Sequence, residues 1–145
     1  MSKTFTVAEA QVLLPVLEAL LRRAQEMATR ADELEGEMQA LNHRIFLSGG
    51  MHVDLVAAAR RRGERDKAAQ AAKDTLAEID AIGVKVQDLA EGLLDFPCQL
   101  SGETVMLCWK MGEPMITHWH GPEEEYSARK PLDARFDKSE RERPN

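Results

Sequence analysis

The sequence is poor in aromatic residues and cysteines, and it contains no long apolar run. Aromatic side chains make up 5% of the 145 residues, and there are two cysteines. Two cysteines are too few for a disulfide scaffold, so we expect a cytoplasmic protein. The longest apolar run, residues 13–21, is interrupted by Pro15 and Glu18, which excludes a membrane-spanning helix. The N-terminus lacks a basic segment followed by an apolar run, and we therefore expect no secretory signal.

The sequence motifs of familiar enzymes are also missing. There is no Gly-rich phosphate loop and no GxGxxG, GxSxG, CxxC or HExxH motif. Basic residues are outnumbered, with 19 Lys and Arg against 25 Asp and Glu, and the formal net charge is -6. Such a chain is a poor candidate for a protein held on nucleic acid by its overall field, so nucleic acid is not an expected partner.

Helical periodicity dominates the first half of the chain. Thr6 and Glu9 have the spacing of a capping box, which predicts a helix start. Between Leu13 and Ile45 apolar residues recur at alternating steps of four and three, the 3.5-residue period of a coiled coil. The segment 48–50, Ser-Gly-Gly, predicts the end of this helix.

A second helix is predicted from about Val53 to Ile82. A short glycine-containing loop between two arms of similar length favours an antiparallel helical hairpin over residues 5–82. The expected apolar seam of the second arm consists of Leu55, Ala58, Arg62, Arg65, Ala69, Ala72, Leu76 and Ile79. Because many of these residues are alanines, the hairpin buries little on its own. We therefore expect a homodimer that forms a four-helix bundle, with an elongated monomer as the alternative.

The basic stretch 60–67 of the second arm has two interpretations. It resembles a nucleic-acid patch by composition. If the hairpin folds about its glycine loop, however, Glu37 lies beside Arg61 and Glu33 lies beside Arg65. We favour this second interpretation, in which ion pairs between the arms set their register.

After Gly83 the pattern changes to that of strands. Residues 93–100, 104–110 and 115–120 have strand-like composition and are separated by turn residues. They predict a small antiparallel β-meander over residues 83–120, covered on one face by the start of the first helix. The expected fold is therefore α+β, a single domain over residues 1–132 with a C-terminal extension at 121–132. The polar segment 133–145 is expected to be a disordered tail.

Two histidines in the last predicted strand are candidates for a metal site. Strand alternation places His118 and His120 on one face, where they could bind a divalent transition metal with a third ligand. The candidates for that ligand are Glu113, Asp95, Cys108 and the acidic run from Glu123. A polar ligand pocket without metal, and histidines at the surface or in packing, are the alternatives.

The position of Cys108 depends on the strand register. If Gly112-Glu113 closes a two-residue turn, Cys108 lies opposite Thr117 and points away from the histidines. A change of register by one residue would reverse this. Cys98 and Cys108 are also expected to be neighbours across the first turn, as buried free thiols.

Several segments together resemble an uncharacterised family of short bacterial proteins, a domain of unknown function with family number 2203. The resemblance covers nearly the whole chain to about Leu132. It is carried by Thr6–Ala10, Leu13–Pro15, Gly92–Pro97, Leu107–Lys110, Gly112–Pro114, Trp119-His120, Arg129, Pro131 and Leu132. Of the two histidines only His120 fits the family pattern, so the resemblance implies a polar site formed by Asp95, Glu113, His120 and Arg129. It implies no activity.

Two hypotheses of function follow. The first is an interaction or ligand-binding module that self-associates through its helical hairpin and binds a protein partner or small ligand. The second is a metal- or small-ligand-dependent enzyme, with His120 as a ligand or general base. In that enzyme Glu113 and Asp95 supply carboxylates, and Arg129 clamps an anion.

Overall fold

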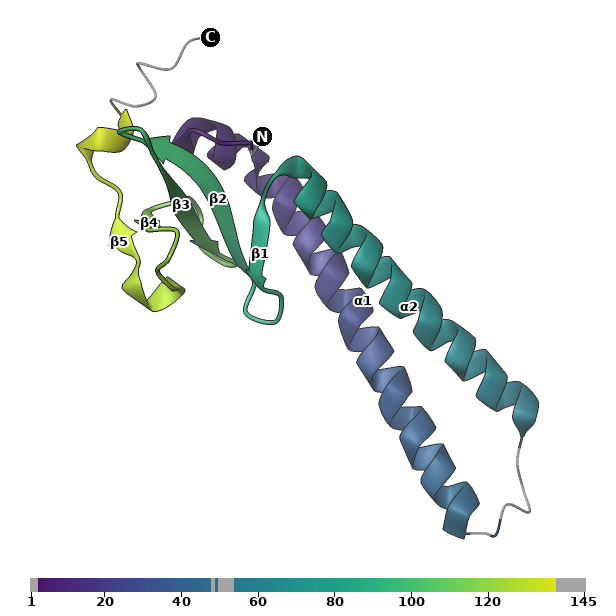
Figure 1. The fold of residues 1–145 in the computed structure, drawn as a ribbon. Helices are drawn as coiled ribbons and strands as arrows, with labels where there is room; N and C mark the ends of the chain where they lie inside the picture. Colours follow the sequence, from purple (N-terminus) through teal and green to yellow (C-terminus); the bar gives the residue numbers. More distant parts are fainter. Residues whose placement is uncertain (1–2, 48, 50–53, 138–145) are drawn as a thin grey trace. The chain divides into compact units, whose positions relative to one another are not determined.

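The computed structural model describes residues 3–47, 49 and 54–137. It contains two long helices, α1 (Val7–Leu47) and α2 (Leu55–Ile82), followed by an antiparallel sheet (Figure 1). The predicted α+β class, with a helical hairpin and a β-meander, is confirmed. None of the helices in the described part of the chain is long and apolar enough to cross a membrane.

The chain divides into two compact units. The first comprises residues 1–21 and 76–145 and contains the sheet together with the start of α1 and the end of α2. The second comprises residues 22–75 and contains the remaining parts of both helices.

The sheet of the first unit has five strands among the described residues, in the order of the chain. All four pairings are antiparallel. The strands are β1 (Lys85–Asp88), β2 (Leu93–Leu100), β3 (Glu103–Lys110), β4 (His118–His120) and β5 (Lys130–Pro131). A short 3₁₀ helix, Tyr126–Ala128, precedes β5. The meander is thus longer than the three strands expected, because short strands extend it at both edges.

One face of the sheet packs on the start of α1. The capping box forms as predicted, since Glu9 Oε1 accepts the Thr6 N–H (2.9 Å) and Thr6 Oγ1 accepts the Glu9 N–H (3.1 Å). The buried core joins residues of α1 and α2 to alternate residues of β2, β3 and β4. Its members include Leu14, Leu17, Leu21, Ile79, Leu94, Phe96, Leu107, Trp109 and Trp119. Because side chains alternate along a strand, the intervening residues project from the opposite, outer face.

The register between β3 and β4 differs by one residue from the expectation. Cys108 pairs with His118, not with Thr117. The loop before β4 is longer than two residues because Pro114 has no N–H for a ladder and the Glu113 carboxylate accepts the Lys110 N–H (2.7 Å). Of the two registers considered, the one shifted by a single residue is therefore present, and it places Cys108 on the same face as His118 and His120.

The two cysteines are not neighbours. Cys98 pairs with Val105 and Cys108 pairs with Asp95. Both cysteines are buried and outside any disulfide, but Cys98 belongs to the core and Cys108 lies on the outer face. The expectation of cross-strand neighbours is wrong because it assumed a different pairing across the first turn.

The packed part of the first unit extends beyond Leu132. Phe136 is buried, and its ring lies 5.6 Å from that of Trp119. Placing the start of the tail at residue 133 is therefore wrong for residues 133–137, because an aromatic side chain within this polar segment reaches the core. Residues 138–145 lie outside the described part.

Ion pairs connect the two helices within the second unit. Arg61 and Glu37 form the expected pair (3.7 Å). Arg65, however, pairs with Glu35, not with Glu33. Ser48 and Gly50 of the expected loop, and Val53, the expected start of the second helix, lie outside the described residues.

The apolar seam of α2 is also shifted from the expected one. Leu55 and Arg62 are exposed, whereas Ala68 and Thr75 are buried. The inward face of α2 therefore consists of residues that recur at alternating steps of four and three, as expected for α1. They are Arg61, Arg65, Ala68, Ala72, Thr75 and Ile79.

Candidate functional site

Three polar residues of adjacent strands are buried on the outer face of the sheet. Asp95 of β2, Cys108 of β3 and His120 of β4 are 1%, 1% and 3% exposed. Asp95 and Cys108 are direct partners across the ladder, and His120 lies two residues from the partner of Cys108. Their ligand atoms all lie within 4.8 Å of one another. A carboxylate, a thiol and an imidazole therefore meet at one point of the sheet.

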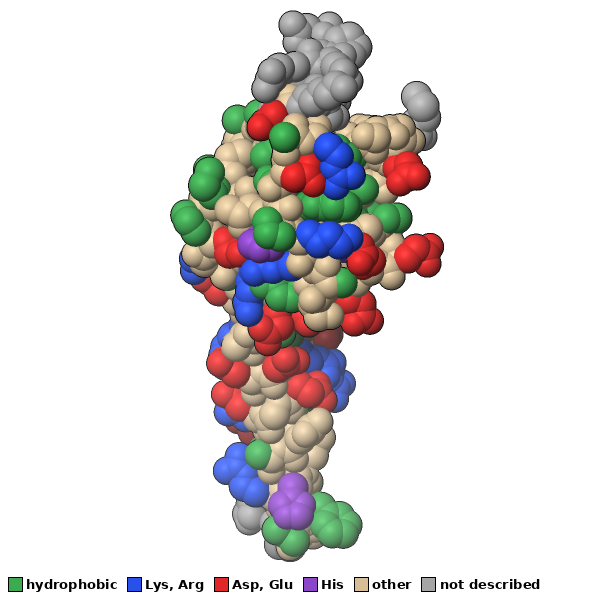
Figure 2. Space-filling model, turned by 90° about the vertical axis from the view of Figure 1, so that its left-hand side faces the viewer, with side chains coloured by type: hydrophobic (Ala, Val, Ile, Leu, Met, Phe, Trp, Pro, Cys, Tyr) green, Lys and Arg blue, Asp and Glu red, His purple; other side chains and the backbone are tan. Residues whose placement is uncertain are grey.

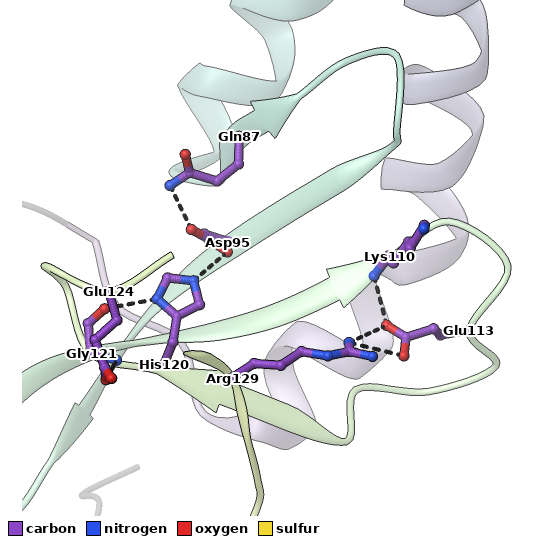
Figure 3. A network of polar contacts seen from close by, with 8 residues as sticks. All are labelled: Gln87, Asp95, Lys110, Glu113, His120, Gly121, Glu124 and Arg129. Carbon is purple, nitrogen blue, oxygen red and sulfur yellow. Dashed lines mark hydrogen bonds and ion pairs between the residues drawn. The ribbon is translucent and has the colours of Figure 1, made fainter. Parts of the chain in front are cut away.

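Both ring nitrogens of His120 have a partner (Figure 3). Nδ1 lies 2.7 Å from the Gly121 carbonyl oxygen, and Nε2 lies 3.1 Å from Asp95 Oδ1. Because a carbonyl oxygen only accepts, Nδ1 carries a hydrogen and Nε2 faces the carboxylate. The other Asp95 oxygen, Oδ2, accepts a hydrogen bond of 2.6 Å from the Gln87 amide. The imidazole and the carboxylate are thus held in fixed orientations.

The Cys108 thiol is protonated at neutral pH in this arrangement. Burial, and next to it the negative charge of Asp95, raise the pKa of Cys108 to about 11, while the Arg129 guanidinium acts in the opposite direction. A nucleophilic cysteine needs a lowered pKa. The arrangement therefore does not favour a nucleophilic role for this thiol.

Glu113 and Arg129 form a second polar pair beside the first (Figure 3). Arg129 Nη1 lies 3.2 and 3.1 Å from the two Glu113 carboxylate oxygens. The guanidinium also stacks over the Tyr126 ring, 4.4 Å from its centre. Burial lowers the pKa of Arg129, but the Glu113 charge more than offsets this, and the pKa is raised overall. The cation that was expected to clamp an anion is already neutralised by a neighbouring carboxylate.

A cavity of about 400 Å³ opens on the outer face. Its lining consists of Gln87, Asp88, Leu93, Asp95, Cys108, His120, Glu124, Glu125 and Tyr126. Four of these residues are carboxylates and none is Lys or Arg. Glu124 accepts hydrogen bonds from Lys130 Nζ (2.9 Å) and from the Gly121 N–H (2.7 Å). These two contacts lower the pKa of Glu124, so this carboxylate stays charged.

The structure brings the four candidate polar residues together as two pairs, Asp95 with His120 and Glu113 with Arg129. It does not bring His118 into the cluster of ligand atoms, and the His118 Nδ1 atom instead contacts Thr117 Oγ1 (2.8 Å). Among the described residues, the group with metal-ligand spacing contains His120 but neither His118 nor Glu113.

Sequence reasoning missed the residues that complete the site. Gln87, Gly121 and Tyr126 come from the edge strand β1 and from the segment between β4 and β5, whereas Glu124 belongs to the acidic run that was a ligand candidate. The alternation of side chains shows which residues of one strand share a face, but it does not show which residues of an edge strand or a loop lie beside that face. The signal for Cys108 was present in the sequence, because Pro114 argues against pairing immediately after Gly112-Glu113.

Comparison with known proteins gives one match. The family model described as "Uncharacterized conserved protein (DUF2203)" matches residues 3–132. Neither the curated proteins nor the solved structures gave a match. Because the match covers most of the chain, including every residue of the cluster, the protein belongs to the DUF2203 family of uncharacterised conserved proteins.

Proposed function

We propose that this protein is a ligand-binding module whose cavity on the outer face of the sheet binds a small cation. One observation carries the proposal, namely that Asp88, Asp95, Glu124 and Glu125 line a cavity without Lys or Arg. Carboxylates of one sign in a concave site focus the electrostatic field and raise the local concentration of cations. Asp95 is 1% exposed, so water screens its interaction with a bound cation less than that of the more exposed carboxylates.

A binding role is favoured over acid–base catalysis by the contacts of His120. A general base needs a nitrogen that reaches the substrate proton. In His120, the Gly121 carbonyl occupies Nδ1 and Asp95 occupies Nε2. A cation that binds between Nε2 and the carboxylate, in contrast, would use both groups in their present orientation.

Cation-dependent stability tests this proposal. The melting temperature of the full chain should rise with Zn²⁺, Mn²⁺ or spermidine, relative to sodium chloride at equal ionic strength, because a ligand that binds the folded state stabilises it. The double variant Asp88→Asn, Glu125→Gln should reduce the rise. Glu103→Gln, which removes an exposed carboxylate of β3 outside the cavity, is the matched control. Equal responses of both variants, or stabilisation by none of these cations, would exclude a cation-binding cavity.

We further propose self-association through the helical unit, as a second role. Four large apolar side chains are mostly exposed at the end of α1 and the start of α2: Phe46 (81%), Leu47 (69%), Leu55 (73%) and Val56 (68%). Apolar side chains gather at this end of the hairpin, at the foot of Figure 2. An apolar cluster next to a seam rich in alanine supports contact with a second copy.

Sedimentation equilibrium tests self-association. The wild type should dimerise at tens of micromolar, and Phe46→Ser with Leu55→Ser should weaken the dimer. The matched control is Val12→Ser with Val16→Ser, which removes exposed apolar side chains from the first unit. A monomeric wild type would refute this role.

A further inference from the structure

We infer that the cation is a divalent transition metal, with Zn²⁺ the best match, bound by Asp95, Cys108 and His120 at the floor of the cavity. The inference rests on the proposed function, because it names the cation which that cavity would take up. It assigns the role of thiolate ligand to Cys108, which was one of several candidates for the third ligand in the sequence, and it leaves His118 and Glu113 out of the metal site.

The distances between the three donor atoms are close to those of a tetrahedral site. Metal–ligand bonds of about 2.0–2.3 Å at tetrahedral angles separate the ligand atoms by about 3.3–3.6 Å. His120 Nε2 and Asp95 Oδ1 are 3.1 Å apart, and no pair of the three atoms exceeds 4.8 Å. A movement of the thiol by about 1 Å, within the reach of a side-chain rotation, therefore completes the three-ligand geometry.

The groups around the ligands already have the arrangement that metal sites require. A metal-bound imidazole donates its second N–H to a carbonyl or carboxylate, and this contact fixes which nitrogen binds. His120 Nδ1 donates to the Gly121 carbonyl and leaves Nε2 for the metal. A ligating carboxylate is in turn hydrogen-bonded, as Asp95 Oδ2 is by Gln87. These two contacts hold two of the three ligands without using the donor atoms themselves.

The charge of the ligand set matches a dication. When the metal binds, it displaces the proton held between His120 Nε2 and Asp95 Oδ1, and the Cys108 thiol loses its proton as the sulfur–metal bond forms. Both protons go to solvent, and His120 binds as a neutral imidazole. One thiolate and one carboxylate then neutralise the two positive charges, so the buried centre carries no net charge. Soft thiolate with imidazole favours Zn²⁺ over Mg²⁺ or Ca²⁺. Three protein ligands would leave a fourth position for water or a small ligand, and the cavity that all three residues line would give access to it.

Cobalt titration of the tag-free full chain tests the inference, because Co²⁺ replaces Zn²⁺ and reports its ligands by absorption. The wild type should bind one equivalent and show a thiolate-to-cobalt charge-transfer band with intense tetrahedral ligand-field bands. Cys108→Ser should lose the charge-transfer band. Cys98→Ser is the matched control, since it removes the other buried thiol from the opposite face, and it should keep the band.

A second variant covers the case in which Cys108→Ser does not fold. Gln87→Ala removes the hydrogen bond to Asp95 but none of the three ligands, and it should lower the cobalt affinity about 10–100-fold while the charge-transfer band persists at saturation. Cobalt binding by the wild type without the band would overturn the metal site, as would an unchanged spectrum in Cys108→Ser. Cation binding that depends on Asp88 and Glu125 but not on Cys108 would overturn this inference and leave the proposed function standing, whereas absence of all cation binding would end both.

Discussion

The raised pKa of Cys108 predicts a specific loss of stability at alkaline pH in the metal-free protein. Its pKa lies at about 11 in the folded chain, compared with an ordinary value of 9.0, chiefly because the thiol is buried. A raised pKa in the folded state means that the stabilisation is fully present below pH 9 and disappears as the pH rises to about 11. At about 1.4 kcal/mol for each pH unit, the loss is at most about 3 kcal/mol.

Urea denaturation in the presence of a chelator measures this loss. The free energy of unfolding is determined at several pH values between 8 and about 11, for the wild type and for Cys108→Ala. Other groups titrate in both proteins, so their contributions cancel in the difference between them. The wild type should lose up to about 3 kcal/mol more than the variant across this range. Cys98→Ala serves as the control, because it measures how much the other buried thiol contributes to the change of the unfolding free energy with pH. A difference between wild type and Cys108→Ala that is constant with pH would refute the reasoning.

Three further substitutions test the fold that positions the site, each by the free energy of unfolding in urea. Gly102→Ala should cost about 1–2 kcal/mol, because Gly102 has a φ of +81° in the β2–β3 turn, which a residue with a Cβ adopts only with strain. An added Cβ meets nothing within 4 Å, so the cost comes from the backbone alone. An unchanged free energy of unfolding would argue against this turn. Thr6→Ala should cost about 1 kcal/mol through loss of the helix cap, and Glu9→Ala should have a similar effect. Phe136→Ala should cost about 3–5 kcal/mol, since the ring is buried against Trp119. A neutral effect there would place residues 133–137 outside the core.

The fold was largely predictable because it depends on periodic patterns that continue over many residues. The 3.5-residue period from Leu13 to Ile45 and the capping box at Thr6 identify α1 without reference to any other part of the chain. The covering of the sheet by the start of α1 followed from chain geometry, since a hairpin returns its second arm to the origin of the first. Edge strands β1 and β5 were harder to foresee because two to four residues carry too little periodicity.

The site was predictable only in part, because the residues that meet there depend on the register between β3 and β4. Asp95, Glu113 and His120 were candidates from the sequence pattern, the family resemblance added Arg129 and grouped the four, and each lies at or beside the cavity. Cys108 was a candidate ligand whose side of the sheet stayed open, because a two-residue turn before β4 would turn it away from the histidines and a single residue of register reverses the face of every side chain in a strand. The contacts that decide this register, such as the Glu113 carboxylate on the Lys110 N–H, are tertiary and cannot be read from spacing.

X-ray absorption at the zinc edge tests the central claim most directly, because it reports the atoms bound to the metal without any substitution. The zinc-loaded wild-type chain should show one sulfur at about 2.3 Å, with nitrogen and oxygen ligands at about 2.0–2.2 Å. The sulfur and the imidazole would correspond to Cys108 and His120, which are both buried within the described cluster. A first shell of oxygen and nitrogen alone, with no sulfur, would contradict the account.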